Sequence, residues 1–461
     1  MRDAQIDIFI EVSPGETRAA LLDGDSRLCH LYLERAHEPS RQGSIFLGRV
    51  LKVEKGMGAA FIDIGSGESA FLGRARTLHE GQALVVQVVR DGWGGKVAGV
   101  VSRPQVEGRY LAISADHDDS SKIECDRNIV GRSLRMQLEK SVEKFSVVGE
   151  KIRIRVAAIN VGSSELEFEV TQLRKRWHKI QNSAATGSGP QVLEPTSSLA
   201  LRLMREITKI NRIIVDDRSV YEDCVRLAAS EMPDLVGKIV HFRDVSPLFR
   251  DHGIDEQVDE ALERNIKLPS GLSLTIDQTE ALTAIDVDMG GASVRGRQEE
   301  ECTRANLIAV PEIARQMILR NLAGLIVIDF ISMRNKPNRR RVVDAMRKAL
   351  HASSDSVVDV LGMTAAGLIE VTRQRKGPAL AEFFTKRQPP APSPVALACA
   401  ALRDVLRLRG PGHPVLIASP DVIAVLKTTL SLALAKTDRR LGEPLALRQV
   451  DKPNWFEVIL E

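Results

Sequence analysis

The sequence predicts a multidomain protein of mixed α/β and α+β class, and three observations support this class. At 461 residues the chain is long for a single core, and this length suggests about three domains. Short alternating strands with glycine at the turns crowd the N-terminal part, which is typical of a small β-barrel. Strands and helices alternate between about 263 and 385, which is typical of a layered α/β domain.

The composition sets limits on function and location. The formal net charge is only +3, so any basic surface for a nucleic acid must be local. The five cysteines are scattered, which argues against a disulfide framework and against a zinc site formed by neighbouring residues. The N-terminus has no long apolar core and no run of about 18 apolar residues occurs, so neither a signal peptide nor a membrane span is expected. These features predict a cytoplasmic protein without a membrane partner.

The N-terminal segments alternate as strands. "QIDIFIEVS" and "TRAALLDGDSRLCHLYLER" read as strands joined by turns, with Asp23-Gly24-Asp25 as one turn. "GSIFLGRVLKVEKGMGAAFIDIGSGESAFLGRA" and "EGQALVVQVVRDGWGGKVAGVV" then give roughly five short strands, which predicts a closed barrel of the OB type.

Aromatic side chains on this barrel have two interpretations. Phe46, Phe61 and Phe71 each suit the barrel core, and for any one of them the core is the simpler interpretation. Phe61 and Phe71 also fall on consecutive strands, with cationic residues such as Lys96 nearby. Aromatic and cationic side chains on an OB-type barrel form a surface on which bases stack while phosphates are neutralised.

The middle and the end of the chain contain further units. "KIRIRVAAINV" (151–161) predicts a strand, and "SSELEFEVTQLRKRWHKIQ" predicts a charged helix. Its run 174–176 is interpreted as a solvated face, with RNA contact as the less favoured alternative. The segment 182–198 lacks apolar periodicity and reads as a loop or linker. Four prolines in "KRQPPAPSP" (386–394) predict an extended spacer before a small C-terminal α/β piece.

Three aspartates stand where the strand pattern favours other residues. "GLSLTIDQTEALTAIDVD" gives two alternating strands, and Asp286 and Asp288, two residues apart, project from the same face. Asp329 interrupts the apolar run "GLIVIDFISM", which reads as a buried strand where a charge is costly. For any single aspartate, a turn or a backbone hydrogen bond is the simpler explanation.

For all three aspartates together, a hard divalent cation is the more economical explanation. Mg²⁺ prefers oxygen ligands and is commonly held by one or two carboxylates together with substrate phosphate. Nearby cations can hold a polyanionic substrate; they are Arg339, Arg340, Arg341, Arg373, Arg375 and Lys376. The spacing alone does not distinguish a nuclease from another Mg²⁺-dependent phosphoesterase.

Several motifs closely resemble the ribonuclease E/G family, and the resemblance covers essentially the whole chain. The most specific motifs are "TEALTAIDV" and "LIVIDF". The segments "AAFIDIG" and "SPLFRDHGIDEQVDEAL" precede them, in the order that the family has. The resemblance implies that Asp286 and Asp329 are the catalytic, metal-binding aspartates, that Asp288 stands where the family usually has Asn, and that Phe61, Phe71 and Lys96 bind RNA. It implies cleavage of single-stranded RNA during ribosomal RNA processing and messenger RNA decay, leaving 5′-phosphates.

The same resemblance implies a domain order. An RNase H-like domain (1–40 and 196–262) is interrupted by an OB-fold barrel (41–115) and a sensor-like domain (116–195). A DNase I-like catalytic domain (263–385), the proline-rich linker (386–394) and a small C-terminal domain (395–461) follow.

Two departures from the family pattern bear on sensing and on partners. The spacer 386–394 has no cysteine where relatives carry a zinc-binding C-P-x-C motif, so no structural zinc is expected and a homodimer would not be zinc-linked. In the 5′-monophosphate sensor, Ala157-Ala158 stands where the family has Arg-Thr.

Two hypotheses remain open. The first is a Mg²⁺-dependent endoribonuclease in which Arg373 and Arg375 contact RNA. The second is a divergent RNA-binding homologue with little or no cleavage.

Overall fold

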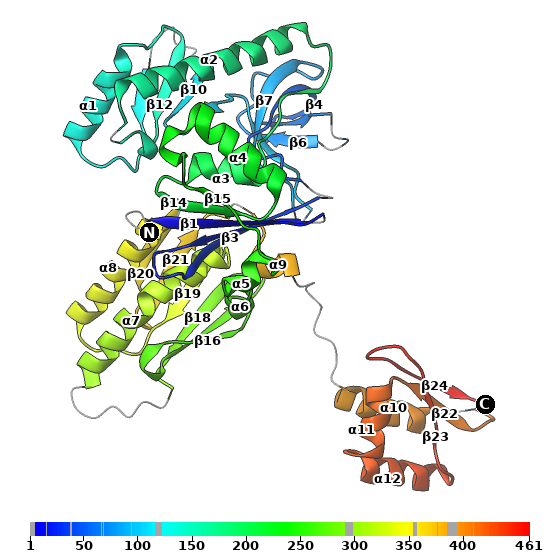
Figure 1. Ribbon diagram of the computed structural model, residues 1–461. Coiled ribbons are helices and arrows are strands. Elements are labelled where there is room, and N and C mark those ends of the chain that lie inside the picture. Colours follow the sequence, from blue (N-terminus) through cyan, green and yellow to red (C-terminus); the bar gives the residue numbers. More distant parts are fainter. Residues whose placement is uncertain are drawn as a thin grey trace. The chain divides into compact units, whose positions relative to one another are not determined.

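The computed structural model describes residues 5–461 except 15, 37–38, 66, 68, 94, 116–121, 160, 291–297, 354–356, 376, 385–393 and 409. The chain divides into two compact units, Met1–Phe383 and Phe384–Glu461 (Figure 1). The architecture is mixed α/β with a closed barrel, as the sequence predicts. No helix in the described part of the chain is both long and apolar enough to cross a membrane.

The first sheet joins the N-terminus to strands about 200 residues further along the chain. Its order is β15-β14-β1-β2-β3. The strands are β1 Ile6–Val12, β2 Glu16–Leu22, β3 Leu28–Arg35, β14 Ile210–Val215 and β15 Ile239–His241. Helices α3 (Leu199–Glu206) and α4 (Arg218–Glu231) cover Ile8 and Ile10 on one face. Helices α5 (Leu248–Asp251) and α6 (Ile254–Glu260) cover Phe9 on the other. Both faces of this sheet are therefore buried.

The barrel is closed by five strands. They are β4 Ile45–Glu54, β5 Ala59–Asp63, β6 Ser69–Leu72, β7 Ala83–Arg90 and β8 Gly99–Val101, in the order β4-β5-β6-β8-β7, and β4 also pairs with β7. Phe46 lies in the barrel core, as the core interpretation predicts. Gly48 permits the close approach of β4, because a Cβ there would lie 2.6 Å from the Ile62 side chain.

The segment predicted as a linker is largely structured, so that prediction is wrong. Helix α2 (Ser163–Thr186) extends into it, and β13 (Gln191–Glu194) pairs antiparallel with β4 of the barrel. Alanines extend the helix and the short strand extends the barrel sheet, and neither requires apolar periodicity. The charged run is not simply solvated either, since Arg174 pairs with Glu150 at 2.7 Å and Arg176 with Glu194 at 2.6 Å.

Helix α2 packs on a four-stranded sheet of order β11-β12-β10-β9. Its strands are β9 Val106–Glu107, β10 Leu111–Ala115, β11 Lys122–Cys125 and β12 Glu150–Ile154, accompanied by helix α1, Arg132–Glu143. The 3₁₀ turns are η1 Val156–Ala158, η2 Pro233–Leu235 and η3 Pro269–Gly271.

The sheet that carries the aspartates has the order β16-β17-β18-β19-β21-β20. Its strands are β16 Asn265–Lys267, β17 Ser273–Gln278, β18 Leu282–Asp288, β19 Gly324–Asp329, β20 Val358–Met363 and β21 Leu368–Arg373. Helices α7 (Gln298–Leu319) and α8 (Lys336–Ser353) pack against it around a core that includes Ile285, Ile326 and Ile369. The predicted strand–helix alternation is confirmed, and α7 continues through Pro311 without a break.

Strand β19 is buried on one face only, which corrects the prediction of a buried strand. Ile326 and Ile328 are fully buried, whereas Leu325 is 38% exposed and Asp329 is exposed. The apolar run does not reveal this, because the helices α7 and α8 that decide which face is covered come from elsewhere in the chain.

The second unit contains a three-stranded sheet and three helices. The sheet has the order β23-β22-β24, with β22 Pro414–Ala418, β23 Ala446–Gln449 and β24 Phe456–Leu460. The helices are α10 Pro394–Arg407, α11 Pro420–Lys427 and α12 Ser431–Leu441, and the short α9, Leu380–Phe384, precedes them. The predicted spacer lies outside the described residues except for Pro394, which begins α10.

Candidate functional site

Asp286 and Asp329 lie side by side at the ends of two parallel strands. Strand β18 pairs with β19 in a register that sets Asp286 opposite Asp329. Paired residues on neighbouring strands project from the same face, and the strands lie about 4.8 Å apart. Both side chains are exposed on the face that α7 and α8 leave open. The structure therefore brings together the two aspartates that the sequence singles out.

The electrostatics of this pair suit the binding of a cation. The pKa of Asp286 is raised, first by partial burial and then by repulsion from Asp329 and Asp288. Neither Asp286 nor Asp329 forms an ion pair with a cationic side chain in the described part of the chain. Adjacent carboxylates without a counter-charge are a donor set that suits a hard divalent cation.

Asp288 projects from the same face as Asp286, one pleat further along β18. Its side chain accepts a hydrogen bond from the backbone N–H of Gly290 at 3.2 Å. Among the described residues, no group of three or more His, Cys, Asp and Glu side chains is arranged to hold a metal ion. Asp288 is thus placed beside the pair and is not part of a preformed three-ligand cage.

A small cavity of about 50 Å³ borders Asp329 and is also lined by Met333 and Arg339. Arg339 donates from Nε to the carbonyl oxygen of Met333 at 2.6 Å, which holds the guanidinium near the start of α8. The neighbouring Arg340 lies 3.9 Å from Asp344, and Arg341 lines a different cavity. Lys376 lies outside the described residues.

Phe61 and Phe71 form a half-exposed aromatic pair on the barrel. They are direct partners on β5 and β6, with ring centroids 6.0 Å apart in an edge-to-face arrangement. Strand β6 also pairs with Gly99, where the loop that carries Lys96 ends. Lys96 itself is exposed. The structure therefore gathers the three predicted barrel residues on one part of the barrel.

Trp93 lies beside Lys96 in the barrel loop, and the sequence patterns do not reveal its contacts. Trp93 and Lys96 form an isolated antiparallel bridge, with N–H to carbonyl hydrogen bonds of 3.0 and 3.1 Å. The guanidinium of Arg375 lies 5.0 Å from the centroid of the Trp93 ring. Arg375 is thus stacked against the barrel loop, and this contact joins the barrel to the segment after β21.

Arg373 has a different environment from Arg375. It is 8% exposed, and its Nη1 donates to Asn321 Oδ1 at 2.9 Å and to the carbonyl oxygen of Leu322 at 2.8 Å. Arg373 pairs with Gly324, at the end of β19 opposite Asp329, so it lies roughly 17 Å from the aspartates along the strand. These contacts give Arg373 a structural role and lend no support to the predicted RNA contact.

At the predicted sensor position, Ala157-Ala158, the neighbouring Arg155 is engaged by the protein itself. Ala158 is fully buried after β12 in η1, and Arg155 donates to the carbonyl oxygen of Gly108. The guanidinium of Arg155 also lies 3.8 Å from Glu107.

A closed barrel with half-exposed aromatic rings, followed by a layered domain with paired aspartates, is the architecture expected of a multidomain nucleic-acid enzyme. Residues 105–376 match the model of the Ribonuclease E/G family, and the chain belongs to this family.

Two curated relatives from Escherichia coli strain K12 extend this comparison. The chain is 30% identical to Ribonuclease G over 477 aligned positions, which cover 96% of each protein. It is 31% identical to Ribonuclease E over 391 positions, which cover 80% of this chain but only 36% of Ribonuclease E. A Ribonuclease G from Haemophilus influenzae is 30% identical, over 80% of this chain and 79% of that protein.

Proposed function

We propose that this protein is a Mg²⁺-dependent endoribonuclease that cleaves single-stranded RNA in ribosomal RNA processing and messenger RNA decay, leaving 5′-phosphates. The observation that carries the proposal is the pairing of Asp286 with Asp329 on an open sheet face, without a cationic partner among the described residues. Family membership supports RNA as the substrate.

Two surfaces have different roles in this proposal: the aspartates bind the metal ion, and the barrel binds RNA. Asp286 and Asp329 would hold the metal ion, and Asp288 would support the site by holding the backbone at Gly290. A bound Mg²⁺ supplies charge stabilisation at the phosphodiester and lowers the pKa of a bound water. Phe61 and Phe71 would stack on bases while Lys96 neutralises phosphate.

The finer architecture belongs to the same proposal. The first sheet with its helices would be an RNase H-like domain, interrupted by the OB-fold barrel and the sensor-like unit. The sheet with the aspartates would be a DNase I-like domain. We also propose a cytoplasmic enzyme that forms, if it dimerises, a homodimer without a zinc link.

The experiment is cleavage of a short, end-labelled, A/U-rich single-stranded RNA with Mg²⁺, with EDTA as control. The RNA carries either a 5′-hydroxyl or a 5′-monophosphate, and we expect similar rates because Arg155 is already engaged by Gly108 and Glu107. We expect internal cleavage that EDTA and Asp286→Asn each abolish. Cleavage that persists in both would contradict the metal site.

The alternative is an RNA-binding homologue with little or no cleavage. In that case the wild type binds the same RNA at every Mg²⁺ concentration and leaves it intact. The binding curve of the Asp286→Asn variant would then match that of the wild type.

A further inference from the structure

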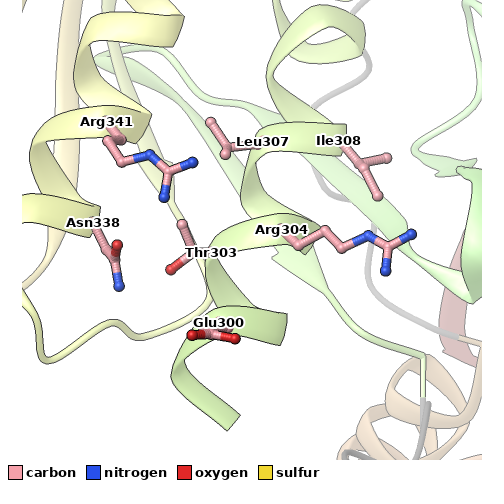
Figure 2. Close-up of a pocket in the computed structure, with 7 residues that line it drawn as sticks. All are labelled: Glu300, Thr303, Arg304, Leu307, Ile308, Asn338 and Arg341. Atoms are coloured by element: carbon pink, nitrogen blue, oxygen red, sulfur yellow. The ribbon is translucent and has the colours of Figure 1, made fainter. Parts of the chain in front are cut away.

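A second cavity, of about 310 Å³, lies between α7 and α8 on the helical side of the domain (Figure 2). Its lining from α7 has the spacing of a single helix face, with Glu300, Thr303 and Leu307 in one stripe. Asn338 and Arg341, one turn apart, contribute from α8. Both helices follow the strand ends that carry the aspartates, so the cavity lies at the same end of the domain.

The relative position of the two helices at the cavity is fixed by Glu299. Its carboxylate accepts hydrogen bonds from the backbone N–H groups of Arg334 and Asn335, both at 2.9 Å, just before α8 begins. Asn338 Nδ2 reaches the same carboxylate at 3.4 Å, and Thr303 Oγ1 donates to the Glu299 carbonyl oxygen at 2.8 Å. The cavity is therefore held open by a network that does not use its arginines.

Arg304 and Arg341 are the unusual members of the lining. Both are exposed, and within the described residues neither has a carboxylate partner. Three other arginines on the same helices are paired: Arg315 with Glu312 at 2.6 Å, and Arg340 and Arg347 with Asp344 at 3.9 and 3.1 Å. Among the described residues of these two helices, Arg304, Arg341 and Arg339 have no carboxylate partner; the cavity collects the first two, and Arg339 instead donates to the carbonyl oxygen of Met333.

The charge balance favours an anion. Glu300 also lines the cavity, but it already takes part in an interaction of its own. In Figure 2 Arg341 extends from α8 toward Leu307, whereas Arg304 extends along the far side of α7. The two guanidinium groups therefore lie apart, which suits two successive phosphates of one strand better than a single phosphate group. Partly buried Leu307 and Ile308 offer an apolar surface between them.

We infer that this cavity binds the phosphate backbone of single-stranded RNA, as an accessory subsite for the strand that reaches the Asp286–Asp329 pair. The inference rests on the proposed function for its choice of RNA. Guanidinium groups are well matched to phosphate oxygens, and single-strand binding through phosphates depends steeply on salt.

The test compares an Arg304→Gln/Arg341→Gln variant with the matched control Arg218→Gln/Arg226→Gln on α4, which removes the same charge from positions paired with Glu222 and Asp223. Binding of a labelled single-stranded RNA of roughly 20 nucleotides is measured by fluorescence anisotropy in EDTA, over a range of salt concentrations. We expect the first variant to bind about tenfold or more weakly. The slope of log affinity against log salt should also fall by about 1.4, the value for two phosphates. The control should stay within about twofold of the wild type.

Two further measurements make the result decisive. Thermal unfolding of both variants establishes that each is folded, and titration with adenosine 5′-monophosphate tests the cavity for a free nucleotide. RNA affinity equal to that of the control overturns the inference, and so does saturable stabilisation by the free nucleotide with unchanged RNA binding. Because binding is measured without Mg²⁺, a wild type that binds RNA but fails to cleave it contradicts the proposed function alone.

Discussion

Two regions of this protein place carboxylates in opposite ways. Glu169 on α2 is buried, and its oxygens accept hydrogen bonds from the backbone N–H groups of Arg109, Tyr110 and Leu111 at 2.6 to 3.2 Å. Asp286 and Asp329 are exposed, and repulsion from Asp329 helps to raise the pKa of Asp286. The first carboxylate has its partners supplied by the fold, whereas the other two lack a counter-charge among the described residues. The partners of Glu169 give it a structural role, whereas the uncompensated charges of Asp286 and Asp329 support the proposed metal site.

The largest expected effect tests the exposed pair. Asp286→Asn or Asp329→Asn should lower the cleavage rate on the order of 10³-fold, since several kcal/mol of charge stabilisation depend on the metal ligands. The midpoint of thermal unfolding should stay the same or rise slightly, because each change removes repulsion at an exposed site. Single-turnover cleavage and a thermal melt check the two parts. A large loss of stability would place the pair among the structural carboxylates.

The next effect tests the buried carboxylate. Glu169→Gln should lower the free energy of unfolding by about 1–3 kcal/mol, because the amide NH₂ would face backbone donors that need an acceptor. Gly108 allows the close approach, since a Cβ there would lie 2.6 Å from the Glu169 carboxylate. Urea unfolding measures the loss, and cleavage per folded molecule should be unchanged. Wild-type stability of the variant would contradict the assigned role.

Glu169 should also make stability depend on pH. Burial raises the pKa of Glu169 to about 7 from 4.5, although the three N–H groups oppose the shift. Between these values the folded chain keeps a proton that the unfolded chain releases, so its contribution is full below pH 4.5 and falls as the pH rises to 7. The decline should be at most about 3 kcal/mol. Urea unfolding of the wild type and of Glu169→Gln across this pH range isolates the contribution of Glu169 to the free energy of unfolding. Parallel plots of stability against pH for the two proteins would disprove this contribution.

Strand positions could be predicted from local alternation, but the exposure of their faces could not. The pattern of "LTAIDVD" sets Asp286 and Asp288 on one face, and the structure agrees. The run "LIVID" in β19 predicts burial on both sides, yet Val327 is half-buried and Leu325 is exposed. Coverage depends on where distant helices pack, and this information is absent from the strand itself.

For the candidate site residues too, local patterns were informative and contacts with distant segments were not. Asp286 and Asp329 could be singled out from the sequence because each aspartate interrupts a regular pattern in its own strand, and the structure pairs them. Trp93 interrupts no pattern, and its contact with Arg375 joins residues 282 positions apart in the sequence and 5.0 Å apart in space. Arg373 and Arg375 are two residues apart, and nothing in the sequence distinguishes them. Only the fold shows that Arg373 is buried.

These two arginines extend the comparison to cations. Arg373→Gln should lower the free energy of unfolding by about 1–3 kcal/mol, since Asn321 and Leu322 lose a buried donor, and RNA affinity of the folded protein should not change. Arg375→Gln should cost at most about 1 kcal/mol of stability and weaken RNA binding severalfold. Urea unfolding measures the stability of each variant, and fluorescence anisotropy measures its RNA affinity. The reverse assignment of effects would refute the distinction between the buried Arg373 and the partly exposed Arg375, whose guanidinium lies 3.6 Å from Glu382.

The smallest expected effect concerns Asp288, which is intermediate between the two kinds of carboxylate. It is exposed on the same face as Asp286, yet it already accepts a hydrogen bond from the N–H of Gly290. An asparagine keeps a side-chain oxygen for this bond and removes one charge that raises the pKa of Asp286. Asp288→Asn should therefore change the cleavage rate by no more than about threefold, whereas Asp288→Ala, which loses the bond, should lower it by about tenfold. Single-turnover rates at saturating Mg²⁺ distinguish the two variants. If Asn is as damaging as Ala, the charge of Asp288 matters more than its hydrogen bond, and Asp288 belongs with Asp286 and Asp329 as a metal ligand.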